Sequence, residues 1–193
     1  MGSEPPGRPR SAVVHQAILE AARDLLVESG YAGLSIDRVA ARAGVGKQTV
    51  YRRWASKAPL VAEAVLDAHG SAAPPETGDL DRDLRAWLHG QSTSQATPRN
   101  AALVRALAAA AAADLRDADE LYRQLTGPSR DELVERLRAG VGANQVRADA
   151  DLAAAADALL GALLYQTLAG DPAAYSPQRV DGLLDIILAG LRP

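Results

Sequence analysis

The chain has 193 residues, of which 48% are hydrophobic, and it contains no cysteine. This length suits one ordinary domain or a small domain joined to a larger one, and the hydrophobic content excludes a wholly disordered chain. The lack of cysteine excludes disulfides, thiolate metal sites and a cysteine nucleophile. Although the net charge is −3, residues 38–57 hold six basic residues and no acidic one. This run indicates a surface that meets phosphate, with a solvated charged face as the alternative interpretation.

The first segment predicts a flexible arm followed by a helix. Residues 1–10 are rich in proline, glycine and arginine, a composition typical of a disordered leader. A helix is expected to begin after Ser11, which can act as its N-cap, and to end at Gly30, because glycine is favoured just after a helix. Its apolar positions recur at the spacing of one buried stripe: Ile18, Ala22, Leu25 and Leu26.

Three further helices are predicted next, of which the first two are short. Ser35 is expected to cap the second helix, and a tight turn at residues 43–46 leads into a third helix over residues 47–54. Ser56 is expected to cap a fourth helix, with Pro59 in its first turn, where a missing N–H costs little. A tight turn between two short helices is typical of a helix-turn-helix unit, which places one helix in the major groove of DNA.

Residues 70–78 contain glycine, serine and two prolines and predict a domain boundary. No later stretch alternates with period two over a useful length, so no sheet is expected. The sequence therefore predicts an all-α fold of about nine helices, with domains over residues 11–70 and 71–193. The helices of the second domain are expected over residues 80–92, 98–113, 115–139 (with a break near Pro128), 149–169 and 177–191.

Residues 17–66 resemble the DNA-binding domain of the TetR family of bacterial repressors. The match runs without a gap, and it departs from the family pattern at Gly46, where serine is usual, and at Trp54, where phenylalanine is commoner and a core position is expected. The second half resembles the family only in its helix count and in residues 159–168, which are similar to a dimer-forming helix. The matching residues are Gly30-Tyr31, Leu34 to Ala40, Ala43-Gly44-Val45, Lys47 to Trp54 and Ser56-Lys57.

The resemblance implies a set of DNA-binding residues around the third helix. Gln48 and Thr49 match positions that read base edges, since glutamine pairs with adenine and threonine contacts the thymine methyl group. Tyr51 matches an aromatic residue that contacts phosphate, with a half-buried core tyrosine as the alternative. The N-terminus of the helix capped by Ser35 also suits a phosphate. The remaining matches are phosphate contacts, of which Arg52 also reaches guanine in one interpretation: Lys47, Arg52, Arg53 and Lys57.

Arg8 and Arg10 resemble the short arms that enter the minor groove in some family members. Arginine suits a narrow A/T minor groove because the potential there is most negative. An ordinary disordered leader is the alternative.

By resemblance, the second domain forms a homodimer through its last two helices, which pack with those of the partner as a four-helix bundle. Both helices have an apolar surface wider than one buried stripe, although a helix central in its own domain is the alternative. The expected interface residues are Leu159, Leu163, Leu164, Leu184, Ile187 and Leu188.

The resemblance also implies a small-molecule pocket in the second domain. Such sites are apolar cavities with few polar groups, and the scarcity of buried charge favours an apolar or weakly polar ligand. The alternative for most of these side chains is a place in the core. The expected pocket residues are Trp87, His89, Gln91, Leu103, Leu107, Tyr122, Leu125 and Tyr165.

No catalytic or metal-binding constellation is apparent, because the three histidines stand on separate elements without metal-ligand spacing. No cofactor is implied. A signal peptide is not indicated, and the longest apolar stretch, residues 152–168, is short for a membrane span, so a cytoplasmic location is expected.

The resemblance favours a non-enzymatic repressor that binds a palindromic operator in double-stranded DNA as a homodimer and is released by a small molecule. The alternatives are a regulator of the same fold without a small-molecule effector, an activator, and, least favoured, an α-helical enzyme.

Overall fold

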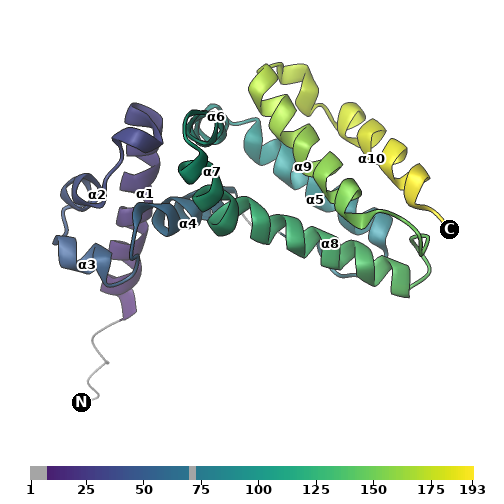
Figure 1. Cartoon of the computed structure of the whole chain (residues 1–193), viewed down its shortest axis with the longest axis horizontal. Helices are drawn as coiled ribbons and strands as arrows, with labels where there is room; N and C mark the ends of the chain where they lie inside the picture. The colour runs from purple at the N-terminus through teal and green to yellow at the C-terminus, as the bar shows by residue number, and fades with distance from the viewer. Residues whose placement is uncertain (1–7, 70–72) are drawn as a thin grey trace, which may run out of the picture. The chain divides into compact units, whose positions relative to one another are not determined.

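The computed structural model describes residues 8–69 and 73–193 (Figure 1). Within these ranges the chain forms ten α-helices, one short π-helical turn, one short 3-10 turn and no strand, which confirms the all-α prediction. Contacts between Cα atoms divide the described residues into two units, one of residues 8–67 with 106–124 and one of residues 68–105 with 125–193. The break near residue 67 lies close to the predicted boundary, while residues 106–124 group with the first unit.

The first unit is built around the amino-terminal helices. α1 begins at Arg8, so residues 8–10 are helical and the predicted arm is wrong for these three positions, while residues 1–7 lie outside the described residues. A break occurs inside α1 at Gly30, whose φ of +66° is favoured by glycine, as the sequence predicted. The helices are α1 (Arg8–Gly33), α2 (Ile36–Arg42), α3 (Lys47–Tyr51), α4 (Lys57–His69, which ends in the second unit), the last part of α6 (Pro98–Ala113) and α7 (Leu115–Leu121).

The core of the first unit follows the predicted apolar stripes. Trp54 is 4% exposed, as expected of a core residue, and its indole N–H donates to the Glu63 carboxylate at 2.7 Å. The ring of His15 stacks on this indole with centroids 5.5 Å apart. Other side chains that are 2% exposed or less include Ile18, Leu25, Leu26, Val39, Val50 and Leu60.

The second unit contains the remaining helices. Its elements are the first part of α6, α5 (Leu80–Gln95), α8 (Gly127–Gly142), α9 (Leu152–Ala169), the 3-10 turn η2 (Pro172–Tyr175) and α10 (Pro177–Leu191). α5 packs against both α9 and α10, and α8 packs against α9 (Figure 1). Their apolar stripes form one core of buried residues, which includes Leu84, Leu88, Leu133, Leu137, Leu159, Leu163, Val180, Leu184 and Leu188.

The helix predicted over residues 115–139 is divided. α7 ends at Leu121, a π-helical turn, η1, spans Tyr122–Thr126, and α8 begins at Gly127. Pro128 has no N–H to donate, and its ring crowds the preceding turn, so an uninterrupted α-helix is disfavoured there. The predicted break near Pro128 is confirmed, and it accounts for ten helices where about nine were expected.

A buried ion pair ties the start of the second unit to α8. Asp83 and Arg136 are 1% and 7% exposed and pair through a charge-assisted hydrogen bond. Asp83 also accepts from the Thr77 backbone N–H at 2.9 Å and the Thr77 hydroxyl at 2.6 Å, while Arg136 Nε donates to the Pro75 carbonyl at 2.9 Å. These contacts hold the segment before α5 in place, because Asp83 and Arg136 are buried charges that need polar partners.

Candidate nucleic-acid interface and effector region

The turn between α2 and α3 has the geometry of a helix-turn-helix. The Ser35 hydroxyl accepts from the Arg38 backbone N–H at 3.3 Å and so caps α2, as predicted. Gly44 has a φ of +67°, which glycine adopts without steric cost, and the Val45 N–H donates to the Ala40 carbonyl at 3.0 Å. These bonds bring the chain around sharply before α3.

α3 exposes the residues that the sequence predicted for reading DNA. Val50 is fully buried and anchors the helix, whereas Lys47 and Gln48 are exposed and Thr49 is half-buried. The Tyr51 side chain is 48% exposed, which disfavours its interpretation as a core tyrosine. One short element therefore presents a mixed set of amide, hydroxyl and ammonium groups on its outer face.

Part of the positive charge predicted for this region is balanced within the unit. Lys47 Nζ donates to the Asp37 carboxylate of α2, and this hydrogen bond raises the pKa of Lys47. The two terminal Arg42 nitrogens, Nη1 and Nη2, each donate to the Glu28 carboxylate at 2.7 Å, which raises the pKa of Arg42 and lowers that of Glu28. The sequence run alone did not show this balance, because both acids lie before it.

The other predicted phosphate contacts differ in whether the protein already binds them: Arg53 and Lys57 form hydrogen bonds within the described residues. Arg53 Nη2 donates to the Ser11 hydroxyl at 2.8 Å. Lys57 Nζ donates to the Tyr31 carbonyl at 3.1 Å and lies 4.0 Å from the centroid of the Tyr31 ring. Arg52 is exposed, and within the described part of the chain its side chain makes no hydrogen bond or ion pair. Of the predicted phosphate contacts, Arg52 therefore meets the least competition from the protein itself.

Arg8 and Arg10 stand in the first turn of α1. Their side chains lie outside the part of the chain that the structure describes, so their role in the minor groove stays a prediction.

The residues predicted for the effector pocket divide between the two units. Leu107 and Tyr122 belong to the first unit and the other six to the second. Trp87 and Leu103 are buried, and the Tyr165 side chain is 71% exposed. Gln91 and Leu125 are half-buried, while His89 Nε2 lies within hydrogen-bond distance of the Asp181 carboxylate. The sequence could not separate these environments, because helical spacing alone does not show which neighbour covers an apolar face.

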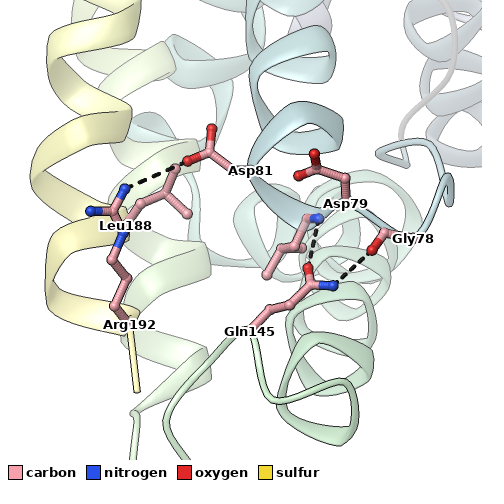
Figure 2. Close-up of a pocket in the computed structure, with 7 residues that line it drawn as sticks. Gly78, Asp79, Asp81, Gln145, Leu188 and Arg192 are labelled. Carbon is pink, nitrogen blue, oxygen red and sulfur yellow. Dashed lines mark hydrogen bonds and ion pairs between the residues drawn. The ribbon is translucent and has the colours of Figure 1, made fainter.

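A pocket at the start of α5 is lined by other residues. It has a volume of about 370 Å³, and Figure 2 shows its lining. The Gln145 amide closes one side, since its nitrogen donates to the Gly78 carbonyl at 2.7 Å and its oxygen accepts from the Leu80 N–H at 2.8 Å. The lining comprises Gly78, Asp79, Leu80, Asp81, Gln145, Leu188 and Arg192, none of which the sequence predicted for a pocket.

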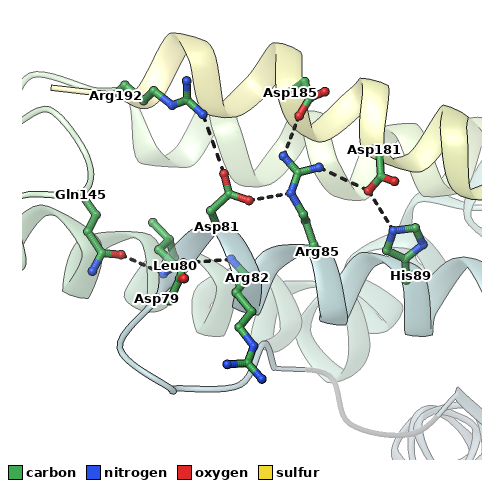
Figure 3. Close-up of polar contacts among 10 residues, drawn as sticks. All are labelled: Asp79, Leu80, Asp81, Arg82, Arg85, His89, Gln145, Asp181, Asp185 and Arg192. Atoms are coloured by element: carbon green, nitrogen blue, oxygen red, sulfur yellow. Dashed lines mark hydrogen bonds and ion pairs between the residues drawn. The ribbon is translucent and has the colours of Figure 1, made fainter.

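A chain of ion pairs joins α5 to α10 (Figure 3). The Arg85 guanidinium lies 2.5 Å from Asp81, 2.6 Å from Asp185 and 3.3 Å from Asp181. His89 Nε2 lies 2.9 Å from the same Asp181 carboxylate. The hydrogen bond to Asp185, followed by that to Asp81, raises the pKa of Arg85, and the one to His89 lowers the pKa of Asp181. His89 thus holds two helices together in this structure.

The predicted dimer residues also divide by burial. Leu159, Leu163, Leu184 and Leu188 are 6% exposed or less and pack within the core of the second unit, so a partner subunit has almost nothing of them left to cover. These four side chains therefore fit the alternative interpretation, a helix that is central in its own domain. The Leu164 side chain is 42% exposed, and Ile187 is half-buried against the core.

α9 and α10 nevertheless each carry exposed apolar side chains. Tyr165, Leu168 and Ile186 are 71%, 51% and 75% exposed. α9 meets the length and composition of a membrane-spanning helix, as the core helices of soluble proteins also can, and 22% of it is buried within the chain. Exposed apolar patches of this kind mark interaction sites with proteins, membranes or ligands.

Within the described ranges, no group of three or more histidine, aspartate or glutamate side chains is arranged to hold a metal ion.

Comparisons with known proteins agree with this arrangement. Residues 18–64 match the family described as "Bacterial regulatory proteins, tetR family", and residues 74–187 match "Tetracyclin repressor-like, C-terminal domain". The chain is 33% identical over 192 residues to the DNA-binding transcriptional repressor TetR of Mycobacteroides abscessus, covering 97% of this chain and 96% of that protein.

Solved structures share the fold along nearly the whole chain. The crystal structure of the TetR family transcription regulator SCO0332 is 31% identical, has a TM-score of 0.71 and covers 93% of this chain and 99% of its own. FadR from Bacillus subtilis, solved in complex with stearoyl-CoA, is 16% identical, has a TM-score of 0.66 and covers 92% of this chain and 100% of its own. This chain therefore belongs to the TetR family of DNA-binding transcriptional regulators.

Proposed function

We propose that the protein is a cytoplasmic, non-enzymatic repressor that binds a palindromic operator as a homodimer and is released by a small molecule. The observation that carries this proposal is the outer face of α3 and its C-cap: Gln48 and Arg52 are exposed and Thr49 is half-buried, beside a fully buried Val50. A short helix anchored on one face and polar on the other is what major-groove reading requires.

Sequence is read by Gln48 and Thr49 in this proposal. A glutamine amide makes two hydrogen bonds to adenine, and the threonine methyl group packs on the methyl group of thymine. Arg52 binds phosphate, and Tyr51 places its hydroxyl on the backbone next to it. Phosphate displaces the Asp37 carboxylate from Lys47 and the Ser11 hydroxyl from Arg53 as the protein docks, because both partners are surface groups that exchange at low cost.

The dimer forms through the exposed apolar surface of α9 and α10. Leu164, Leu168 and Ile186 are its centre, with Ile187 at its edge. Covering this surface removes large apolar side chains from water, and a two-fold axis matches the symmetry of a palindrome.

Release by a ligand works through a shift between two arrangements of the domains. A ligand that favours one arrangement changes the spacing of the two α3 helices, and it weakens DNA binding only by its difference in affinity for the two states. The alternatives are a regulator of the same fold without a small-molecule effector and an activator, since the direction of regulation depends on where the operator lies.

The proposal is tested by footprinting the protein on the promoter DNA of its own gene, and by sedimentation of the complex. The expected result is a two-fold symmetric footprint bound by an even number of chains, with transcription from that promoter decreasing in vitro. An asymmetric footprint held by one chain contradicts the dimeric operator. An increase in transcription identifies an activator.

A further inference from the structure

A buried polar cluster lies at one end of the second unit, apart from the pocket at the start of α5. The apolar stripe of α5 ends in Ser92 and Gln95, which are 2% and 9% exposed. The buried stripe of α9 ends in Thr167, which is 0% exposed. Because Gln95 and Thr167 are hydrogen-bonded to each other, the two stripes become polar at the same place.

Thr167 is the centre of this cluster. Its hydroxyl lies 2.7 Å from Gln95 Oε1 and 3.0 Å from the Leu163 carbonyl, so one proton serves two acceptors. The Tyr175 hydroxyl, in the connection between α9 and α10, donates to Thr167 Oγ1 at 3.1 Å. Arg105 of α6 donates to the Thr167 carbonyl at 3.3 Å. The side chains that meet at Thr167 are therefore neutral, and the guanidinium reaches only the backbone.

Two buried polar atoms on the same two helices have no hydrogen bond within the described part of the chain: the Ser92 hydroxyl oxygen and Gln166 Oε1. Ser92 lies three positions before Gln95, on the same face of α5, and Gln166 adjoins Thr167 on α9. Buried polar groups are almost always paired in native proteins, since an unpaired one destabilises the fold. Two such atoms on facing helices indicate a place built for a group that the chain does not supply.

We propose that this cluster is the polar end of the effector site and that it binds the head group of an uncharged ligand with an O–H or N–H donor. This inference rests on the proposed release by a small molecule. The donor of the ligand binds Gln166 Oε1, and the Ser92 hydroxyl binds the same head group. A carboxylate is disfavoured, because Arg105 is exposed and already occupied at the backbone. The apolar body of the ligand packs beside Leu88 and Leu163, one helical turn before Ser92 and Thr167.

Two sets of matched probes test the chemistry on the full-length protein. 1-Octanol and benzyl alcohol are uncharged donors, their methyl ethers lack the donor, and octanoate and benzoate carry the charge. Binding is measured by calorimetry and by the shift in melting temperature, since a ligand stabilises the fold that it binds. We expect at least one alcohol to bind about fivefold or more tightly than its ether and its carboxylate. Equal binding within each set, or no binding by either alcohol, overturns the proposal.

Substitutions at Ser92 and Gln166 test whether the alcohol binds at this cluster. Ser92→Ala and Gln166→Leu are expected to weaken binding of the alcohol about fivefold to tenfold and to leave the melting temperature of the free protein unchanged or higher, because each removes an unpaired buried group. Thr93→Ala removes an exposed hydroxyl from the same helix and is the matched control. A structural role alone predicts the reverse pattern, with a lower melting temperature and unaltered binding of the alcohol, and that result overturns the site.

Operator binding by the same protein samples distinguishes a failure of this proposal from a failure of the proposed function. If the ligand-free protein fails to bind its operator, the proposed function is contradicted whatever the probes do. If operator binding is intact and no probe binds, only the effector site is contradicted.

Discussion

Lys47, the first residue of α3, donates a hydrogen bond to the carboxylate of Asp37 in the first turn of α2. Both side chains are at least half exposed, at 61% and 50%. The helix predicted to enter the groove is therefore positioned by a contact that lies on the surface proposed to meet phosphate. A DNA phosphate must compete with Asp37 for the same ammonium group.

Removing that competitor is expected to strengthen DNA binding without regard to sequence. Asp37→Asn keeps the size of the side chain and frees Lys47, so the affinity for operator and random DNA should rise about threefold at low salt, as measured by fluorescence anisotropy. Glu28→Gln makes the same change of charge beside Arg42, which is not a predicted DNA contact. An equal rise in both variants means that net charge alone acts, and it contradicts the contact between Lys47 and phosphate.

Arg52 is expected to contribute most clearly to the dependence of binding on salt. Arg52→Ala should reduce the slope of log affinity against log salt by about one unit, because one phosphate contact and its counterion are lost. Arg42→Ala removes an arginine of the same unit that Glu28 holds through two hydrogen bonds, and it should leave the slope unchanged. If Arg52→Ala instead weakens binding at a single base pair of each half-site, Arg52 reads guanine.

Local signals in the sequence were sufficient to predict the helix-turn-helix. Ser35 caps α2, the chain turns at Gly44, and the break in α1 lies at Gly30, where the sequence predicted the end of the first helix. Each of these depends on one residue and its nearest neighbours in the chain, so no tertiary contact is needed to predict it.

The faces of the last helices could not be predicted in the same way. α9 carries leucines around most of its circumference, so Leu163 and Leu164 look alike in the sequence although one is 4% exposed and the other 42%. Contacts with α5 and α8 decide which face is buried. The polar cluster at Thr167 was missed for a related reason, because a lone threonine in an apolar helix gives no signal until its partner from α5 is known.

A charged substitution on the exposed face of α10 tests the predicted dimer interface. Ile186→Asp places a carboxylate where the side chain is 75% exposed, so the fold should be kept while the interface is lost. Sedimentation should show a monomer at micromolar concentration, and operator affinity should fall by about tenfold or more. Leu115→Asp makes the same change at a position 88% exposed on α7 and should remain dimeric. A dimeric Ile186→Asp protein contradicts this interface.

The ion pair of Asp83 with Arg136 makes the stability of the fold sensitive to acid. Burial acts to raise the pKa of Asp83, but the hydrogen bonds from Thr77 and Arg136 outweigh it and lower the pKa below the ordinary value of 3.8. A group whose pKa is lower in the folded state stabilises the fold above its unfolded pKa, and this stabilisation is lost as the pH falls through the folded pKa.

The melting temperature should therefore be steady near neutral pH and fall below about pH 4. Asp83→Asn should lower the melting temperature at pH 7 by roughly 10 °C, because Arg136 is left as a buried charge. The gap between the variant and the wild-type protein should narrow as the pH falls, when followed by circular dichroism. A gap of the same size at pH 3 and pH 7 contradicts a charged Asp83 in the folded protein.

The most direct test of the central claim is the binding of the intact protein to the promoter DNA of its own gene and to random DNA, at about 50 and about 200 mM salt. A dimeric operator reader predicts tighter binding to the promoter at both concentrations, with the preference kept when the overall affinity falls, and a reduced preference in Gln48→Ala. Equal binding to both DNAs, lost together as salt rises, would contradict sequence-specific recognition of this promoter by α3.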